Sequence, residues 1–213
     1  IIEDEVKARL ERWLKTDTPL LERLVQFWMN HFTVSAGKTG LVTAAIGAYE
    51  REAIRPHILG KFDDMVLAVE QHPVMLIYLD NQSSVGPNSR AGKNGAKGLN
   101  ENLAREILEL HTLGVDGGYT QADVTAFARI LTGWIYSDPG NDDLYGGRFT
   151  FAPNRHEPGD VTVLGRVYPE AGKEQGEAAI RDFARHPSTA RHIATKLARA
   201  FVSDDPPPSL VAK

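Results

Sequence analysis

Three things that this sequence lacks limit what the protein can be. Its 213 residues contain no cysteine, which excludes disulfide bonds, thiolate ligands for a metal and a cysteine nucleophile. Its 24 lysines and arginines are outnumbered by 28 aspartates and glutamates, and the net charge of −4 offers no overall positive field to hold a nucleic acid. No apolar run reaches the roughly 18 residues that cross a membrane. We therefore expect no nucleic-acid partner and no membrane span.

The composition is typical of a folded protein. Hydrophobic residues make up 42% of the chain and charged residues 24%, which excludes global disorder. The length suits one large domain, so we expect a single mainly helical domain over residues 1–213. The chain begins at Ile1 and stops at Lys213, shortly after three prolines. We expect it to be part of a longer chain, whose remaining segment is a candidate partner.

The periodicity of apolar residues is helical over most of the chain. Helical patterns cover residues 3–15, 18–32, 49–59, 61–70, 74–79, 99–113, 120–132, 173–185 and 188–202. The exception is the region 134–172, where residues 149–151 and 161–164 have short strand patterns around a polar loop. The sequence therefore predicts a mainly α, multi-helix globular fold with a small β-hairpin insertion near residues 145–165.

A segment rich in glycine and serine interrupts the helical pattern. Residues 81–98 carry Arg90, Lys93 and Lys97 and no acidic residue. The segment has few apolar anchors, and a structureless stretch of this length is usually functional or disordered. We expect residues 81–98 to form a flexible basic loop.

Two histidines lie on helix faces that the apolar pattern assigns to the core. At about 100° per residue, His111 falls in the apolar arc that contains Ile107 and Leu110, and His31 lies in the middle of the face formed by Leu20 and Phe27. A buried imidazole needs partners for both ring nitrogens. We expect both imidazoles to be mostly buried and within about 10 Å of each other, close enough to share a site.

The histidine pair has two interpretations. The first is a site, either for general acid–base chemistry or for a metal held by both histidines and a carboxylate. The second is a hydrogen-bonded core histidine on each helix. Because only two protein ligands are identified, metal binding stays open and no cofactor is predicted. His156 is a third histidine, in a loop that can fold over the helices, and no role is assigned to the histidines at positions 57, 72, 186 and 192.

The opposite face of the helix over residues 99–113 is charged. Arg105 is four residues from both Glu101 and Glu109, so it can bridge either carboxylate. One interpretation is a solvated face with ordinary ion pairs. The other is a pair of carboxylates lining a cleft, with Arg105 holding an anionic group. The candidate catalytic residues are His31, His111, Arg105, Glu106 and Glu109.

Several stretches resemble one known family. They include FWMNHFTVS at residues 27–35, GLNENLAREILELHTLG at residues 98–114 and LTGW at residues 131–134. These resemble the bacterial DUF1800 family, a domain of unknown function, over nearly the whole chain. The resemblance implies an exported or periplasmic location and a sulfatase-like partner protein, and it implies no activity.

Two positions depart from the family's pattern. The family often has a histidine where this chain has Met29, and His-Asp where this chain has His156-Glu157. If Met29 replaces a ligand, a metal site here is weakened.

Two hypotheses of function remain, and whether the chain is an enzyme stays open. The first is an exported, enzyme-like protein with a His/Glu site where the helices that end near His31 and His111 meet. The second is a non-catalytic helical module that acts in surface assembly or partner binding. A deep pocket with convergent histidine and glutamate favours the first, and fully packed histidines under a shallow polar face favour the second.

Overall fold

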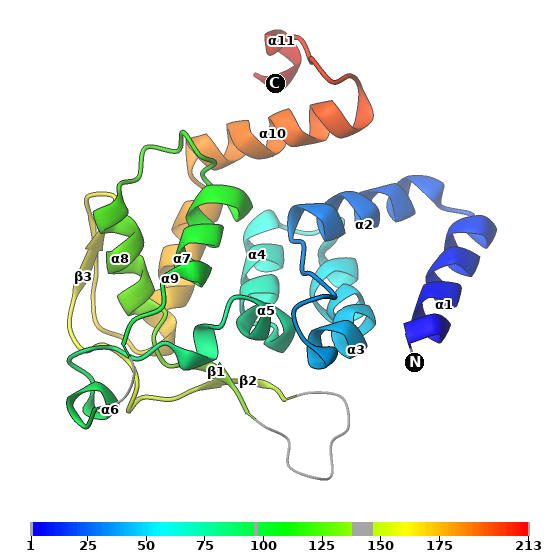
Figure 1. The fold of residues 1–213 in the computed structure, drawn as a ribbon. Helices are drawn as coiled ribbons and strands as arrows, with labels where there is room; N and C mark the ends of the chain where they lie inside the picture. The colour runs from blue at the N-terminus through cyan, green and yellow to red at the C-terminus, as the bar shows by residue number, and fades with distance from the viewer. Residues whose placement is uncertain (1, 96–97, 138–146, 213) are drawn as a thin grey trace.

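The computed structural model describes residues 2–95, 98–137 and 147–212 (Figure 1). The α-helices are α1 (Ile2–Lys15), α2 (Pro19–His31), α3 (Gly40–Tyr49), α4 (Phe62–Glu70), α5 (Pro73–Tyr78), α6 (Arg90–Lys93), α7 (Asn102–Glu106), α8 (Gln121–Ile130), α9 (Lys173–Ala184), α10 (Pro187–Phe201) and α11 (Pro208–Val211). Two π-helical segments, η1 (Glu50–Ile54) and η4 (Ile107–His111), and two 3-10 turns, η2 (Arg55–His57) and η3 (Asn81–Ser83), continue or connect them. None of the described helices is long and apolar enough to cross a membrane.

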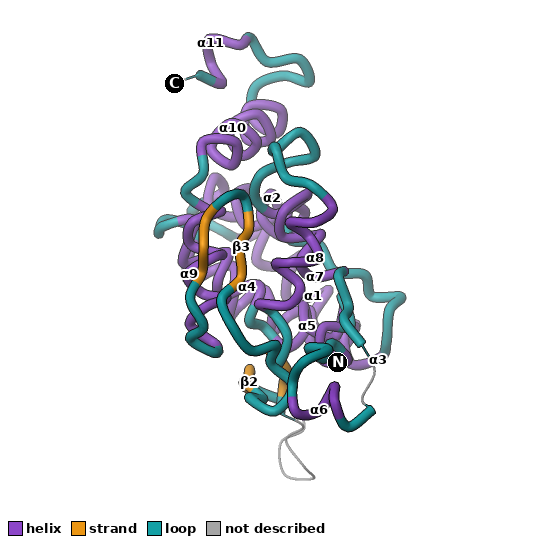
Figure 2. Tube along the Cα trace, turned by 90° about the vertical axis from the view of Figure 1, so that its left-hand side faces the viewer, coloured by secondary structure: helices purple, strands orange, loops and turns teal. Residues whose placement is uncertain are grey.

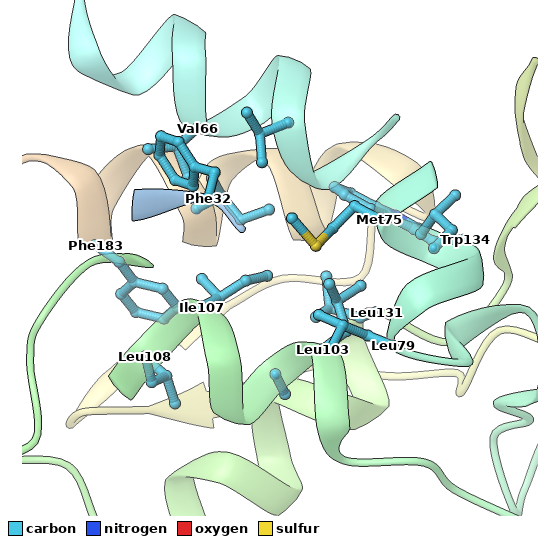
Figure 3. Close-up of a cluster of buried hydrophobic side chains, with 14 of the residues drawn as sticks. Phe32, Val66, Met75, Leu79, Leu103, Ile107, Leu108, Leu131, Trp134 and Phe183 are labelled. Carbon is cyan, nitrogen blue, oxygen red and sulfur yellow. The ribbon is translucent and has the colours of Figure 1, made fainter. Parts of the chain in front are cut away.

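Helices from both halves of the chain enclose a hydrophobic core. Figure 3 shows Val66 of α4 and Met75 of α5 facing Leu103 of α7 and Ile107 of η4, and all four side chains are buried. Helix α4 also packs along α9, and α7 along α8. The core therefore holds α2, α4 and η4 together where the two candidate histidines lie. The expected single domain over residues 1–213 stays a prediction.

The fold class is confirmed as mainly helical, with strands only in two small antiparallel hairpins among the described residues. Strand β1 (Trp134–Tyr136) pairs with β2 (Phe149–Phe151), and β3 (Val161–Val163) pairs with β4 (Arg166–Tyr168). The two predicted strand segments thus belong to different hairpins, seen from the side in Figure 2. Residues 145 and 146 of the predicted insertion lie outside the described residues.

The second hairpin is made by a turn that the residue pattern does not signal. Leu164 and Gly165 both have positive φ angles, 52° and 74°, as a two-residue type I′ turn requires. The hairpin is tied to α8 because Asp123 accepts a hydrogen bond from the backbone N–H of Leu164 at 2.7 Å. Asp123 also forms a capping box with Thr120 at the start of α8.

Residues 81–98 contain more structure than their glycine content predicts. The segment includes η3 and α6, and Val85 is buried. The backbone N–H groups of Gly86 and Ala91 donate to the carbonyls of Arg155 and Asn154, each at 2.8 Å. The segment is therefore paired with a distant part of the chain, whereas its flexibility stays a prediction. Residues 96 and 97 lie outside the described residues.

The helix predicted over residues 99–113 is shorter and changes type along its length. It begins at Asn102, and from Ile107 its hydrogen bonds follow the wider π spacing. A π turn contains more residues than an α turn, so from Ile107 onwards a wheel drawn with α-helical spacing no longer predicts which side chains face the core. Leu110, predicted in the apolar arc, is 43% exposed, while His111 does point into the core. Leu20, predicted on the buried face of α2, is 61% exposed.

Candidate functional site

The two histidines meet in the core, as their positions predict. His31 is the last residue of α2, His111 is the last residue of η4, and each is 3% exposed. Their ring centroids lie 6.2 Å apart. The predicted burial and proximity are confirmed, whereas a catalytic role for either residue stays a prediction.

A buried carboxylate orients His111. Glu70, the last residue of α4, is fully buried, and its Oε1 lies 2.7 Å from Nδ1 of His111. Because an ionised carboxylate only accepts hydrogen bonds, an ionised Glu70 requires the proton of His111 on Nδ1. The second carboxylate oxygen, Oε2, has no hydrogen-bond partner among the described residues. A buried oxygen without a partner is costly, and such sites often have a functional reason.

Both ring nitrogens of His31 are hydrogen-bonded. The Nζ of Lys196 lies 2.7 Å from Nδ1, and Nε2 lies 3.1 Å from the backbone carbonyl oxygen of His111. An ammonium only donates, so Nδ1 accepts and the Nε2–H donates to the carbonyl. Burial, followed by the positive charge of Lys196, lowers the pKa of His31 to about 2. The ring is therefore neutral, and it holds the backbone of His111 in place.

Helix α10 covers the histidine pair with two polar side chains. Lys196 and His192 are one helical turn apart, and the ring of His192 lies 6.1 Å from that of His31. The Nε2 of His192 hydrogen-bonds to the carbonyl of Leu110 at 3.2 Å. Burial lowers the pKa of both His192 and Lys196. Figures 1 and 2 both place α10 across one end of the helical body.

The charged face of α7 and η4 lies next to this buried group. Glu106 is partly buried, and burial raises the pKa of its carboxyl, with the charges of Glu109 and Glu70 adding to the effect and that of His111 opposing it. Arg105 donates to Glu101 at 3.1 Å and to Gln121 at 2.9 Å. Of its two predicted bridges, the structure forms the one to Glu101.

Glu70 and Lys196 were not predicted from the sequence. A glutamate at the C-terminal end of a helix opposes the helix dipole, and this was the available signal for Glu70. Lys196 follows His192 by four residues, and this spacing places both side chains on one face of α10. The sequence predicts no role for His192, because histidines at helix boundaries or on polar faces are ordinarily exposed.

The residues that depart from the family's pattern make structural contacts. His156 is bonded through Nδ1 to the carbonyl of Thr132 at 2.9 Å. Glu157 accepts hydrogen bonds from the backbone and side chain of Asn88. Met29 is partly buried and packs against the core. Within residues 2–95, 98–137 and 147–212, no group of three or more His, Asp or Glu residues is arranged to hold a metal ion.

Three cavities adjoin α1. One of about 650 Å³ is lined by apolar residues of that helix, such as Leu10 and Trp13, and by charged residues that include Arg9 and Glu50. Two smaller ones, of about 500 and 280 Å³, adjoin Arg12. None of these three cavities is lined by the described histidines or by Glu70.

Replacing Glu106 by glutamine is expected to raise the melting temperature at about pH 7. Its raised pKa means that burial disfavours the ionised carboxyl, and the amide removes that charge. We expect a gain of about 0.5 kcal/mol because the side chain stays partly exposed. The gain should fade as the pH falls and Glu106 of the wild type becomes protonated.

Glu109→Gln is the matched variant on the same face, and we expect its stability to change less than that of Glu106→Gln. A clear loss of stability in both variants would mean that the charged face with Glu106 and Glu109 has a structural role. A gain in Glu109→Gln alone would place the functional carboxylate at position 109 instead.

Comparison with family models matches residues 1–213 to a family described as "Protein of unknown function (DUF1800)". The match covers the whole chain, in agreement with the resemblance carried by residues 27–35 and 98–114. No curated protein and no solved structure matches the chain. The chemistry of the site therefore has to be inferred from its own residues.

Proposed function

Since the chain belongs to the DUF1800 family, whose function is unknown, we propose from its own residues that it carries an acid–base site centred on His111. The observation that carries the proposal is the 2.7 Å contact between Nδ1 of His111 and the fully buried carboxylate of Glu70. In this proposal Glu70 orients the ring, His111 accepts and returns a proton through Nε2, and Glu106 supplies a second acid.

The burial of so many ionisable groups supports a chemical role. Glu70, His111, His31 and Lys196 come from four different elements and meet in one place. Replacing buried ionic groups by apolar residues of similar size is often neutral or stabilising, so stability alone does not explain their presence. Segments of π-helix such as η4 are frequent at functional sites, which adds to this argument.

The geometry suggests how the roles are divided. A carboxylate that accepts the Nδ1–H of a histidine leaves the lone pair of Nε2 free to take a proton. The raised pKa of Glu106 keeps its proton available at a higher pH than that of an ordinary glutamate. His31 acts as a positioning residue through the carbonyl of His111. The reaction class that fits is proton transfer during hydrolysis or elimination of a small polar substrate.

A second candidate is the non-catalytic helical module for surface assembly or partner binding. It is favoured by the complete packing of both imidazoles and by a cavity of about 650 Å³ along α1 that neither imidazole lines. In that case the charged face with Glu106 and Glu109 is a contact surface. The exported location and the sulfatase-like partner implied by the family resemblance are proposals that fit either candidate.

The two candidates are separated by an activity test with matched variants. The folded wild type is incubated with a panel of chromogenic carboxyl esters, phosphate esters and glycosides. A general acid–base residue contributes about 10²- to 10⁴-fold, so His111→Gln and Glu106→Gln should each lose about 100-fold or more of any turnover. Glu174→Gln, an exposed carboxylate of α9, should keep the wild-type rate. Absence of turnover across the panel, or turnover that survives in His111→Gln, favours the binding module.

A further inference from the structure

Lys196 differs from the other partnered lysines of the described chain. Lys15, Lys38 and Lys173 each form an ion pair with a carboxylate. The partner of Lys196 is the neutral ring of His31, at 2.7 Å, and no ion pair joins it to a carboxylate within the described ranges. An ammonium group in this position has lost part of its hydration without gaining a counter-charge.

The groups that face Lys196 do not favour its positive charge. They are His31 from α2, His192 from the preceding turn of α10, and His111 behind His31. None of the three carries a negative charge in either protonation state. Burial also disfavours the ammonium form and lowers the pKa of Lys196. The amine therefore carries a free lone pair at a lower pH than a solvated lysine does.

From this geometry we propose that Lys196 is a reactive amine that forms an imine with a small aldehyde or ketone. The lone pair of Nζ forms a bond to the carbonyl carbon, the carbonyl oxygen takes up protons and leaves as water, and a C=N bond remains. The balance is one amine and one carbonyl compound giving one imine and one water, with no oxidant or reductant. The step goes beyond the proposed proton transfer by His111, because the bond-forming atom is Nζ of Lys196.

His31 acts here as a positioning residue. Its Nδ1 accepts one N–H of the amine, which fixes Nζ and leaves the lone pair free for attack. The partly buried position favours a small carbonyl compound over a bulky one. The chemical class assigned to the site is therefore a short aldehyde or ketone.

The experiment traps the imine on the intact wild-type protein. The folded chain is incubated with glyoxylate and sodium cyanoborohydride at about pH 7, and modified lysines are located by peptide mass mapping. Lys7 and Lys61, which are exposed, serve as internal controls. We expect Lys196 to be modified at least about tenfold faster than either control, because burial favours its free amine while Lys7 and Lys61 are exposed. The advantage should shrink as the pH rises towards the range in which all lysines lose their protons.

Two results would overturn this proposal. One is modification of Lys196 no faster than that of Lys7 and Lys61 in the folded protein. The other is a tenfold advantage that persists in urea, where the contact with His31 is lost. Lys196→Arg should remove the fast modification and leave that of Lys7 and Lys61 unchanged. The assay does not use the panel that tests His111 and Glu106, so either proposal can fail without the other.

Discussion

Replacing Glu70 by leucine is expected to destabilise the protein by about 3–5 kcal/mol, because it leaves the buried Nδ1–H of His111 without an acceptor. The carboxylate is fully buried and lies 2.7 Å from that nitrogen, so no water can take its place without rearrangement of the core. Urea unfolding followed by circular dichroism measures the loss. Glu70→Gln keeps an acceptor oxygen, and we expect it to cost clearly less.

The double variant Glu70→Leu/His111→Leu gives this prediction its control. With both polar partners replaced by apolar side chains of similar size, most of the lost stability should return, and the coupling between the two sites should exceed about 2 kcal/mol. The double variant should also lose any activity found for the wild type. Additive losses in the two single variants would contradict a direct interaction between Glu70 and His111.

The stability of the protein is expected to fall as the pH falls from about 7 to about 5. Burial holds the pKa of His31 at about 2, against an ordinary value of 6.5. Below about pH 6.5 the unfolded chain therefore binds a proton at His31, whereas the folded chain does not. The contribution of the neutral His31 ring to the free energy of unfolding is fully present above about pH 6.5. It is lost progressively as the pH falls towards 2. Each proton taken up on unfolding contributes about 1.4 kcal/mol per pH unit.

The control for this prediction is a conservative replacement of the same ring. His31→Gln keeps an N–H donor and an acceptor oxygen. Below about pH 6.5 it should reduce the slope of the free energy of unfolding against pH by about 1.4 kcal/mol per pH unit. His57→Gln, at the end of η2, is the matched variant of a histidine that is not fully buried. His72 and His192 have pKa values lowered first by burial, so part of the slope should remain in His31→Gln. An unchanged slope in His31→Gln would contradict a buried, neutral ring.

The helical part of the fold could be predicted because apolar periodicity and end signals agree there. Pro19 marks the first turn of α2, and Thr120 with Asp123 caps α8. The pairing of the strands could not be predicted, because Leu164 adopts a positive φ that its side chain does not signal. The π-helical segment η4 was also missed, since no local pattern reports a change of hydrogen-bond spacing.

The candidate site was predicted only in part. His31 and His111 were found because a polar residue inside an apolar arc is conspicuous in sequence. Glu70 was missed because a glutamate at the end of a helix is usually exposed, although its carboxylate is fully buried here. The contact between Lys196 and His31 joins residues 165 positions apart, and only the packing of α10 brings them together.

The most direct test of an acid–base centre at His111 is the location of its ring proton, measured by ¹⁵N NMR of the histidines at about pH 8, where an ordinary imidazole is neutral. The site proposed here requires the proton of His111 on Nδ1, facing Glu70, with Nε2 unprotonated and able to accept a proton. It also requires the proton of His31 on Nε2. A proton on Nε2 of His111 would contradict the proposal, because Glu70 would then have to be the protonated partner and the ring would lack a free lone pair for chemistry.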